Sequence, residues 1–270
     1  MKIMNNNLKG RKIAVLMADG FEMAEYTVPV NALRLSGASI TVISLRHGRI
    51  RGVNLHEPAH RVSVDLSIDE AMATDFDALF IPGGFINPDL LRQSERARSF
   101  VRSFDLAKKP IASLCHGPWV LGSSGLLEGR TLSSWPGIRD DVVNAGGIWV
   151  DQPVVRDGNL LTSRGPQDFA EFVPALLAFF AEPISEMVSR SVGTQATSSP
   201  QRTQAPAVML GTMRWMPRPS FRGFAVGALL GGGLAMMMQS RRFRSTQAMR
   251  APVKSPWVEE DFTVSTATYM

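Results

Sequence analysis

Short runs of consecutive hydrophobic residues, bounded by turn-forming residues, recur between residues 12 and 182. Segments in which the hydrophobic residues follow helical spacing separate them. Uninterrupted hydrophobic strands that alternate with helices indicate a parallel sheet covered on both faces, which predicts a doubly wound α/β domain. The predicted strands are KIAVLMA at 12–18, ASITVISL at 38–45, FDALFIPGG at 76–84 and PIASLC at 110–115, with TLSSW and LLTSR later.

The helical spacing is clearest in three segments, at residues 26–37, 94–109 and 167–182. Two other segments are typical of hairpins or edge strands: RVSVDLS at 61–67 and IWVDQPVVRDGNLLT at 148–162. The second contains an Asp-Gly pair, which favours a tight hairpin turn. The pattern therefore predicts a folded domain over residues 11–184, preceded by a short tail at 1–10.

The composition changes after this domain. Residues 185–222 are rich in Ser, Thr, Gln and Pro, which is typical of a flexible linker. Residues 223–240 form a Gly-rich apolar segment that we expect to be helical, and 241–270 form a basic and then acidic tail. The uncharged run at 223–238 is shorter than the roughly 20 residues that cross a bilayer. A short membrane helix, an interfacial or partner-binding helix and a disordered segment remain alternatives.

The basic residues are concentrated in the C-terminal part of the chain. The whole chain has a net charge of +5. Residues 185–270 contain 10 Lys and Arg against 4 Asp and Glu, a net +6, whereas residues 1–184 contain 19 against 20, a net −1. Nucleic-acid binding needs clustered positive charge on the folded surface, so we predict no nucleic-acid partner for the domain. The basic tail makes membrane association through residues 223–244 an alternative.

The chain contains a single cysteine, Cys115. One cysteine cannot form an internal disulfide, which favours a reducing compartment. The first 12 residues, MKIMNNNLKGRK, have neither the apolar stretch nor the small-residue cleavage site of a secretory signal. We therefore predict a cytoplasmic location.

Cys115 lies in KKPIASLCHGPWVLGSSG, at the end of a predicted strand. Gly117 would permit a sharp turn there, and Pro118 suits the first turn of a following helix. Unpaired N–H groups at a helix N-terminus favour a thiolate, so this position predicts a lowered pKa for Cys115. A buried structural cysteine is the alternative interpretation.

Two other strand ends are predicted to lie beside this cysteine, because ligand sites of α/β sheets form at the carboxyl ends of the strands. IPGG at 81–84 would direct the N–H groups of Gly83 and Gly84 into the same crevice as an oxyanion hole. DGFEMAEYTVP at 19–29 adds the carboxylates of Glu22 and Glu25 after the first strand.

Five blocks of the sequence resemble the ThiJ/PfpI family, and in particular its PfpI branch of intracellular proteases and deglycases. They are GFEMAEYTVPV, FIPGG, ASLCHGP, SWPGIRDDVVNAGG and LLTSRGPQD, in family order over about residues 11–182. The resemblance implies a flavodoxin-like fold and a cysteine on a strained nucleophile elbow. It also implies a homo-oligomer whose subunits share an active site.

The resemblance also implies roles for individual residues. Cys115 would be the nucleophile and His116 its partner, while Glu25 matches the acidic residue that hydrogen-bonds to the thiol. Glu22 matches a second and more variable acidic residue. Asp89, in GGFINPDLLR, matches the acidic residue that orients the histidine of a neighbouring subunit.

The histidines distinguish this chain from some related enzymes. The four are His47, His56, His60 and His116, so none follows the helix after Cys115. Glutamine amidotransferases of the related superfamily use a downstream histidine, which this chain lacks. HEPAH at 56–60 matches a zinc-protease signature, but that signature requires a helix and Pro58 disfavours one. We therefore expect a surface loop at 56–60, with no metal and no cofactor.

Three functions remain open. A PfpI-like peptidase would use Cys115 to attack a peptide carbonyl, His116 to move the proton, and the N–H groups of Gly84 and His116 to bind the oxyanion. A glyoxalase or protein deglycase would use the same thiol on methylglyoxal or its adducts, with Glu25 moving protons. A thiol sensor of redox stress would instead be oxidised at Cys115 to a sulfinic acid. The expected partner is thus a small carbonyl compound or a peptide.

Overall fold

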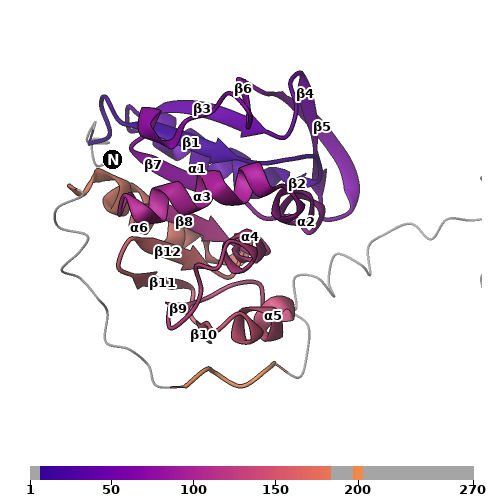
Figure 1. Ribbon diagram of the computed structural model, residues 1–270, viewed down its shortest axis with the longest axis vertical. Helices are drawn as coiled ribbons and strands as arrows, with labels where there is room; N and C mark the ends of the chain where they lie inside the picture. Colours follow the sequence, from indigo (N-terminus) through magenta and orange to yellow (C-terminus); the bar gives the residue numbers. More distant parts are fainter. Residues whose placement is uncertain (1–6, 184–196, 203–270) are drawn as a thin grey trace, which may run out of the picture. The chain divides into compact units, whose positions relative to one another are not determined.

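The computed structural model describes residues 7–183 and 197–202. A central sheet of seven strands has the order β11-β12-β8-β7-β1-β3-β6 (Figure 1). Every neighbouring pair is parallel except β11 and β12. This confirms the predicted mostly parallel α/β architecture. The strands are β1 (Lys12–Leu16), β3 (Ser39–Ser44), β6 (Leu66–Ser67), β7 (Ala78–Ile81), β8 (Ile111–Leu114), β11 (Val154–Asp157) and β12 (Leu160–Ser163).

Helices cover both faces of this sheet. Side chains alternate between the two faces along each strand, and the uninterrupted apolar runs therefore place apolar side chains on both faces, where helices bury them. Ile13 and Val15 pack on one face with α1 (Met23–Leu35) and α6 (Phe169–Ala181). Ala14 and Leu16 pack on the opposite face with α3 (Glu95–Leu106), α4 (Pro118–Ser123) and α5 (Arg139–Asn144). The helix α2 (Ile86–Gln93) follows β7, and single 3-10 turns lie at Ala73–Asp75, Pro136–Ile138 and Pro166–Asp168.

Two smaller sheets flank the central one. In the first, β2 (Phe21–Glu22) pairs with β4 (Arg49–Asn54), which forms an antiparallel hairpin with β5 (Glu57–Ser63). The HEPAH segment at 56–60, which was expected to be a loop, therefore lies mostly on strand β5 (Figure 1). In the second, β9 (Thr131–Leu132) pairs with β10 (Ile148–Trp149). The predicted hairpin turn at Asp157 and Gly158 joins β11 to β12.

A short piece of the expected linker, residues 197–202, contacts the folded domain. The backbone N–H of Ser199 donates to the Trp149 carbonyl at 2.7 Å, and Ser198 Oγ accepts from the Trp149 N–H at 3.0 Å. Arg202 donates to both carboxylate oxygens of Asp151 at 2.8 Å. This part of the linker is therefore held to the domain by hydrogen bonds and an ion pair, although it has few apolar side chains to bury.

Other expectations lie partly or wholly outside the described residues. These are the remainder of the linker, the helix expected at 223–240 and the tail at 241–270. Within residues 7–183 and 197–202, no helix combines the length and apolar character needed to cross a membrane. Leu8, in the expected N-terminal tail, is fully buried, so the packed core extends to that residue.

Candidate active site

Cys115 occupies a tight turn between β8 and α4 and has a φ of 57°. A left-handed conformation is unusual for a residue with a side chain and persists only where the surroundings fix it. Here the Cys115 N–H donates to the Ser163 carbonyl at 3.1 Å, and its own carbonyl accepts from the Trp135 N–H at 2.8 Å. The neighbouring strand and loop thus hold Cys115 on a strained elbow.

Gly117 has a different role from the one expected. Its φ is −50°, which any residue can adopt, so the left-handed turn belongs to Cys115 itself. A Cβ atom at Gly117 would lie 2.3 Å from Ser113 Oγ and 2.9 Å from the Ile81 carbonyl oxygen. Glycine is needed there because the start of α4 approaches β7 and β8 too closely for a side chain.

Glu25 lies in the first turn of α1 and is only 1% exposed. Its carboxyl group hydrogen-bonds to Cys115, and Oε2 accepts the Gly83 N–H at 2.8 Å. The pKa of Glu25 is raised to about 8. Burial is the largest cause and the nearby charge of Glu22 adds to it, while the hydrogen bonds from Cys115 and the Gly83 N–H act in the opposite direction. Glu25 is therefore poised to exchange a proton near neutral pH.

The two glycines after β7 do not share one role. The Gly83 N–H is already bound to Glu25, so it is not free to stabilise an oxyanion. The N–H groups of Gly84 and His116 hydrogen-bond to the Cys115 sulfur. Gly84 has a φ of +81°, a conformation that favours glycine. Because the N–H groups of Gly84 and His116 interact with the reacting sulfur and not with a carboxylate, the oxyanion hole is predicted from these two residues, without Gly83.

Asn87, which the sequence patterns did not single out, holds this turn in place. It is fully buried at the start of α2. Its Nδ2 donates to the carbonyls of Pro82 at 2.8 Å and Gly83 at 3.0 Å, while Oδ1 accepts the Ala18 N–H at 2.6 Å. One side chain thus ties the glycine turn to the end of β1. A polar residue in the otherwise apolar stretch GFINP is the signal that could have revealed it.

His116 lies directly beside the thiol, with Nδ1 3.2 Å from Cys115 Sγ. Its ring stacks on Trp135 with centroids 5.9 Å apart and meets the edge of Trp119 at 5.2 Å. Burial lowers the pKa of His116 to about 4, although the charge of Asp141 raises it slightly. His116 is therefore neutral at physiological pH and a weak base.

The acidic residue whose charge acts on His116 within this chain is Asp141, whereas the resemblance assigns Asp89 to the histidine of a neighbouring subunit. Within this chain, Asp89 pairs with Arg92, at 3.0 and 2.8 Å, and does not bind His116. Asp141, whose charge acts on His116, instead accepts the indole N–H of Trp119 at 2.9 Å. Arg92 lies 4.7 Å above the Trp119 ring, so Asp89 and Asp141 flank the same aromatic group.

The sequence-based expectation of a lowered cysteine pKa is wrong for this environment. Cys115 is 6% exposed, and its burial, together with the adjacent charge of Glu25, raises the pKa of the thiol above its usual value. The N–H groups of His116 and Gly84 lower it only partly. The position at a helix N-terminus was recognised in the sequence, whereas the depth of burial was not.

Glu22 connects this site to the β4–β5 hairpin. It is partly buried, and Oε2 accepts the Leu55 N–H at the hairpin tip at 2.8 Å. Burial raises the pKa of Glu22. Glu22 acts on Glu25 through its charge, and Asp89 is bound to Arg92 of the same chain. The structure thus brings together five of the predicted site residues: Cys115, His116, Glu25, Gly83 and Gly84.

Comparison with known proteins is consistent with this geometry. A model of the DJ-1/PfpI family matches residues 11–178. The chain is 43% identical over 163 residues to "Putative cysteine protease YraA" of Bacillus subtilis, covering 60% of this chain and 94% of the relative. It is 41% identical over 169 residues to "Deglycase TK1284" of Thermococcus kodakarensis, covering 61% of this chain and 99% of the relative.

A solved structure has the same fold. The crystal structure of Drosophila melanogaster DJ-1beta matches with a TM-score of 0.57 and 29% identity, covering 66% of this chain and 96% of the other. The match confirms the flavodoxin-like, doubly wound sheet that the sequence predicts. With the family model covering most of the folded residues, the chain belongs to the DJ-1/PfpI family.

Proposed function

We propose that this chain is a cysteine-dependent deglycase that acts on dicarbonyl compounds such as methylglyoxal and on their adducts. The observation that carries this proposal is the hydrogen bond between Glu25 and Cys115, in which the carboxyl group has a pKa of about 8. Catalytic proton transfer is most efficient when the pKa of the acid or base lies near the working pH. Glu25 meets that condition, whereas His116, with a pKa of about 4, does not.

In the first step, ionised Glu25 accepts the proton of the Cys115 thiol as Sγ bonds to the aldehyde carbon. The π electrons of the carbonyl move to its oxygen, which accepts hydrogen bonds from the N–H groups of Gly84 and His116 and then takes a proton. With an adduct, the carbon–nitrogen or carbon–sulfur bond to the modified group breaks in the same substitution, and that group leaves with the proton that Glu25 took from the thiol.

In the second step, Glu25 transfers a proton from the former aldehyde carbon to the adjacent ketone carbon. The hydroxyl on the first carbon loses its proton and the ketone oxygen gains one, so the product is a lactoyl thioester on Cys115. Water then adds to the thioester, the carbon–sulfur bond breaks, and lactate leaves as the thiol regains its proton. The net reaction adds one water and needs no external oxidant or reductant.

One feature favours this reaction over peptide hydrolysis. Cys115 is 6% exposed, which suits a small carbonyl better than an extended peptide. Relatives named as deglycases support the proposal. The relative named as a putative cysteine protease makes peptide hydrolysis the alternative function.

The proposal is tested by giving the purified chain the hemithioacetal of methylglyoxal with N-acetylcysteine, and fluorogenic peptides in parallel. Lactate, followed by proton NMR, should form with the parent chain and not with Cys115→Ser, while the peptides stay intact. Peptide hydrolysis without lactate would establish the peptidase instead. Neither activity, together with rapid peroxide oxidation of Cys115 to the sulfinic acid, would favour the redox sensor.

A further inference from the structure

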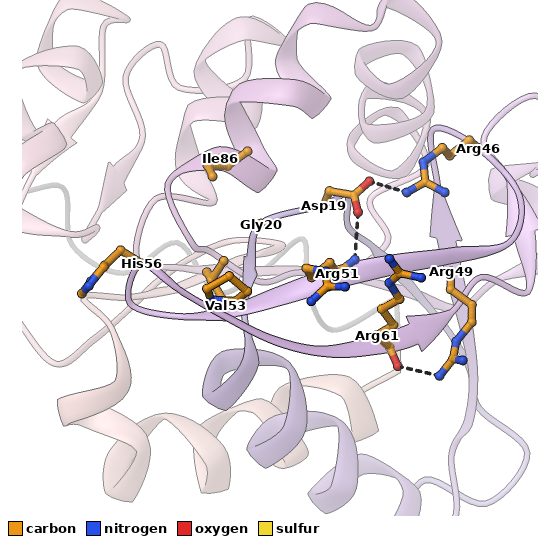
Figure 2. Close-up of a pocket in the computed structure, with 10 residues that line it drawn as sticks. Asp19, Gly20, Arg46, Arg49, Arg51, Val53, His56, Arg61 and Ile86 are labelled. Atoms are coloured by element: carbon orange, nitrogen blue, oxygen red, sulfur yellow. Dashed lines mark hydrogen bonds and ion pairs between the residues drawn. The ribbon is translucent and has the colours of Figure 1, made fainter. Parts of the chain in front are cut away.

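A cavity of about 520 Å³ lies beside the β4–β5 hairpin (Figure 2). Its size falls within the roughly 300 to 1,000 Å³ that small-molecule sites occupy. Four arginines line it, Arg46, Arg49, Arg51 and Arg61, together with a single carboxylate, Asp19. Four positive charges and one negative charge give the lining a formal charge of +3 with its histidine neutral. The cavity therefore contrasts with the domain around it, which is nearly neutral overall.

Asp19 neutralises only one of these arginines. One carboxylate oxygen binds the Arg46 guanidinium at 2.7 Å, and the other accepts the backbone N–H of Arg51 at 2.8 Å (Figure 2). Among the residues that the structure describes, no carboxylate pairs with the guanidinium groups of the other three arginines. Arg49 donates only to the carbonyl oxygen of Arg61, at 3.4 Å. Three guanidinium groups are thus available to an anion.

The hairpin register places these charges against one another. Arg51 lies directly opposite Arg61 in the antiparallel pairing, and Arg49 lies two residues before Arg51 on the same face. Like charges at directly opposed positions destabilise a pair of strands. The buried residues Ile50 and Gly52 occupy the other face, so a register slip cannot separate the charges without exposing Ile50. The repulsion is therefore built into the hairpin, and a bound anion would relieve it.

The cavity is connected to the turn beside Cys115. The Gly20 N–H donates to the Arg51 carbonyl at 2.7 Å, so the loop between β1 and β2 is bonded to the strand that carries the arginine. Gly20 in turn packs against the glycine turn, since a Cβ atom at Gly84 would lie 2.3 Å from its carbonyl oxygen. The cavity and the catalytic turn are thus on opposite sides of one loop.

We propose that this cavity binds a small phosphorylated molecule through its phosphate or diphosphate group. Guanidinium groups form paired, charge-assisted hydrogen bonds with phosphate oxygens, and three of them match a group with several charged oxygens. The cavity volume leaves room for an organic portion of the ligand beyond the phosphate. This site does not depend on the carbonyl chemistry at Cys115, so it stands whether or not that reaction is correct.

The site is tested by isothermal titration calorimetry with inorganic pyrophosphate at physiological ionic strength. The double variant Arg51→Gln/Arg61→Gln removes two of the free guanidinium groups. The control, Lys9→Gln/Arg34→Gln, removes the same charge from exposed positions outside the cavity. We expect saturable binding to the parent and the control, with at least tenfold weaker binding to the cavity variant.

Thermal unfolding shows whether the cavity variant folds. Without anion it should melt at or above the temperature of the parent, because the repulsion between opposed arginines is gone. Pyrophosphate should raise the melting temperature of the parent and control but not of the cavity variant. Absence of saturable binding, equal binding by the folded cavity variant, or equally tight binding of citrate, a polycarboxylate of similar charge, would overturn the phosphate site.

Discussion

The carboxyl group of Glu25 is buried against the thiol of Cys115 and hydrogen-bonds to it. The two groups compete for protons, because ionised Glu25 raises the pKa of the thiol while the hydrogen bond from the thiol lowers the pKa of Glu25. Strongly interacting groups of this kind titrate as a pair. We therefore expect the reactivity of Cys115 to follow the protonation of Glu25 more than that of His116.

Glu25→Gln should stabilise the fold at neutral and alkaline pH. The pKa of Glu25 rises from its ordinary 4.5 to about 8 on folding. Between these two values the unfolded chain releases the proton that the folded chain keeps, so stability falls as pH rises and levels off above about 8. Each pKa unit corresponds to about 1.4 kcal/mol, which predicts a gain of a few kcal/mol for the uncharged glutamine.

Urea unfolding at several pH values between 4 and 9 measures this effect. The gain in free energy of unfolding should be small near pH 4 and should grow until about pH 8. A difference between Glu25→Gln and the parent that is constant over the whole range would show that Glu25 has no raised pKa.

Glu22→Gln should shift the pH dependence of the catalytic site toward lower pH. The charge of Glu22 raises the pKa of Glu25, so its removal makes Glu25 easier to ionise. The midpoint of the rising limb of kcat/KM should therefore move down, by roughly half a pH unit to one unit for a partly screened carboxylate. Glu171→Gln, at an exposed position on α6, serves as the control and should leave the midpoint unchanged.

A shared active site predicts complementation between inactive subunits. Asp89 does not bind His116 of its own chain, so its expected role requires a neighbouring copy. Mixing Cys115→Ala with Asp89→Ala should restore activity, because some sites in hybrid oligomers would contain both groups. If subunits exchange and activity does not return, the shared site is wrong. Loss of activity in Asp141→Asn alone would then assign the positioning role to the acidic residue of the same chain.

Removal of residues 184–270 should reduce stability but not turnover. The bonds of Ser198 and Ser199 to Trp149 are lost in a chain ending at 183 and kept in one ending at 202. At about 1 kcal/mol for each net hydrogen bond, these two bonds alone should make the shorter chain less stable by about 2 kcal/mol, and the bonds of Arg202 to Asp151 and of Arg139 to Ser199 add to the loss. The melting temperature should fall by at least roughly 4 to 8 °C. A lower kcat in either truncated chain would contradict a purely structural role for the segment.

The fold was predictable because its signals are local and repeated. Four apolar runs became the central strands β1, β3, β7 and β8, and the Asp-Gly turn joined β11 to β12. The position of Cys115 after a strand was equally local. Its strained backbone was implied only by the family resemblance, because the contacts that hold the left-handed φ come from Ser163 and Trp135, which are distant in the sequence.

The parts of the site that sequence reasoning missed depend on contacts between separate segments. Asn87 connects β1 to the turn after β7, and the Gly83 N–H is bound by a carboxylate from α1. The polar composition of residues 197–202 indicated a linker, yet two serines bind the backbone N–H and carbonyl groups of Trp149. The amino-acid composition of a segment indicates how much apolar surface it can bury, but it does not predict hydrogen bonds of this kind.

The pH profile of lactate formation by Glu25→Gln shows whether Glu25 controls the proton of Cys115. With the parent chain, kcat/KM should rise with pH through a midpoint near 8 as Glu25 ionises. In Glu25→Gln the rising limb should disappear and kcat should fall by a factor of about 100 to 10,000, the usual contribution of a general base. A Glu25→Gln chain with the parent's profile and a kcat within threefold of the parent's would show that Glu25 does not control the thiol proton.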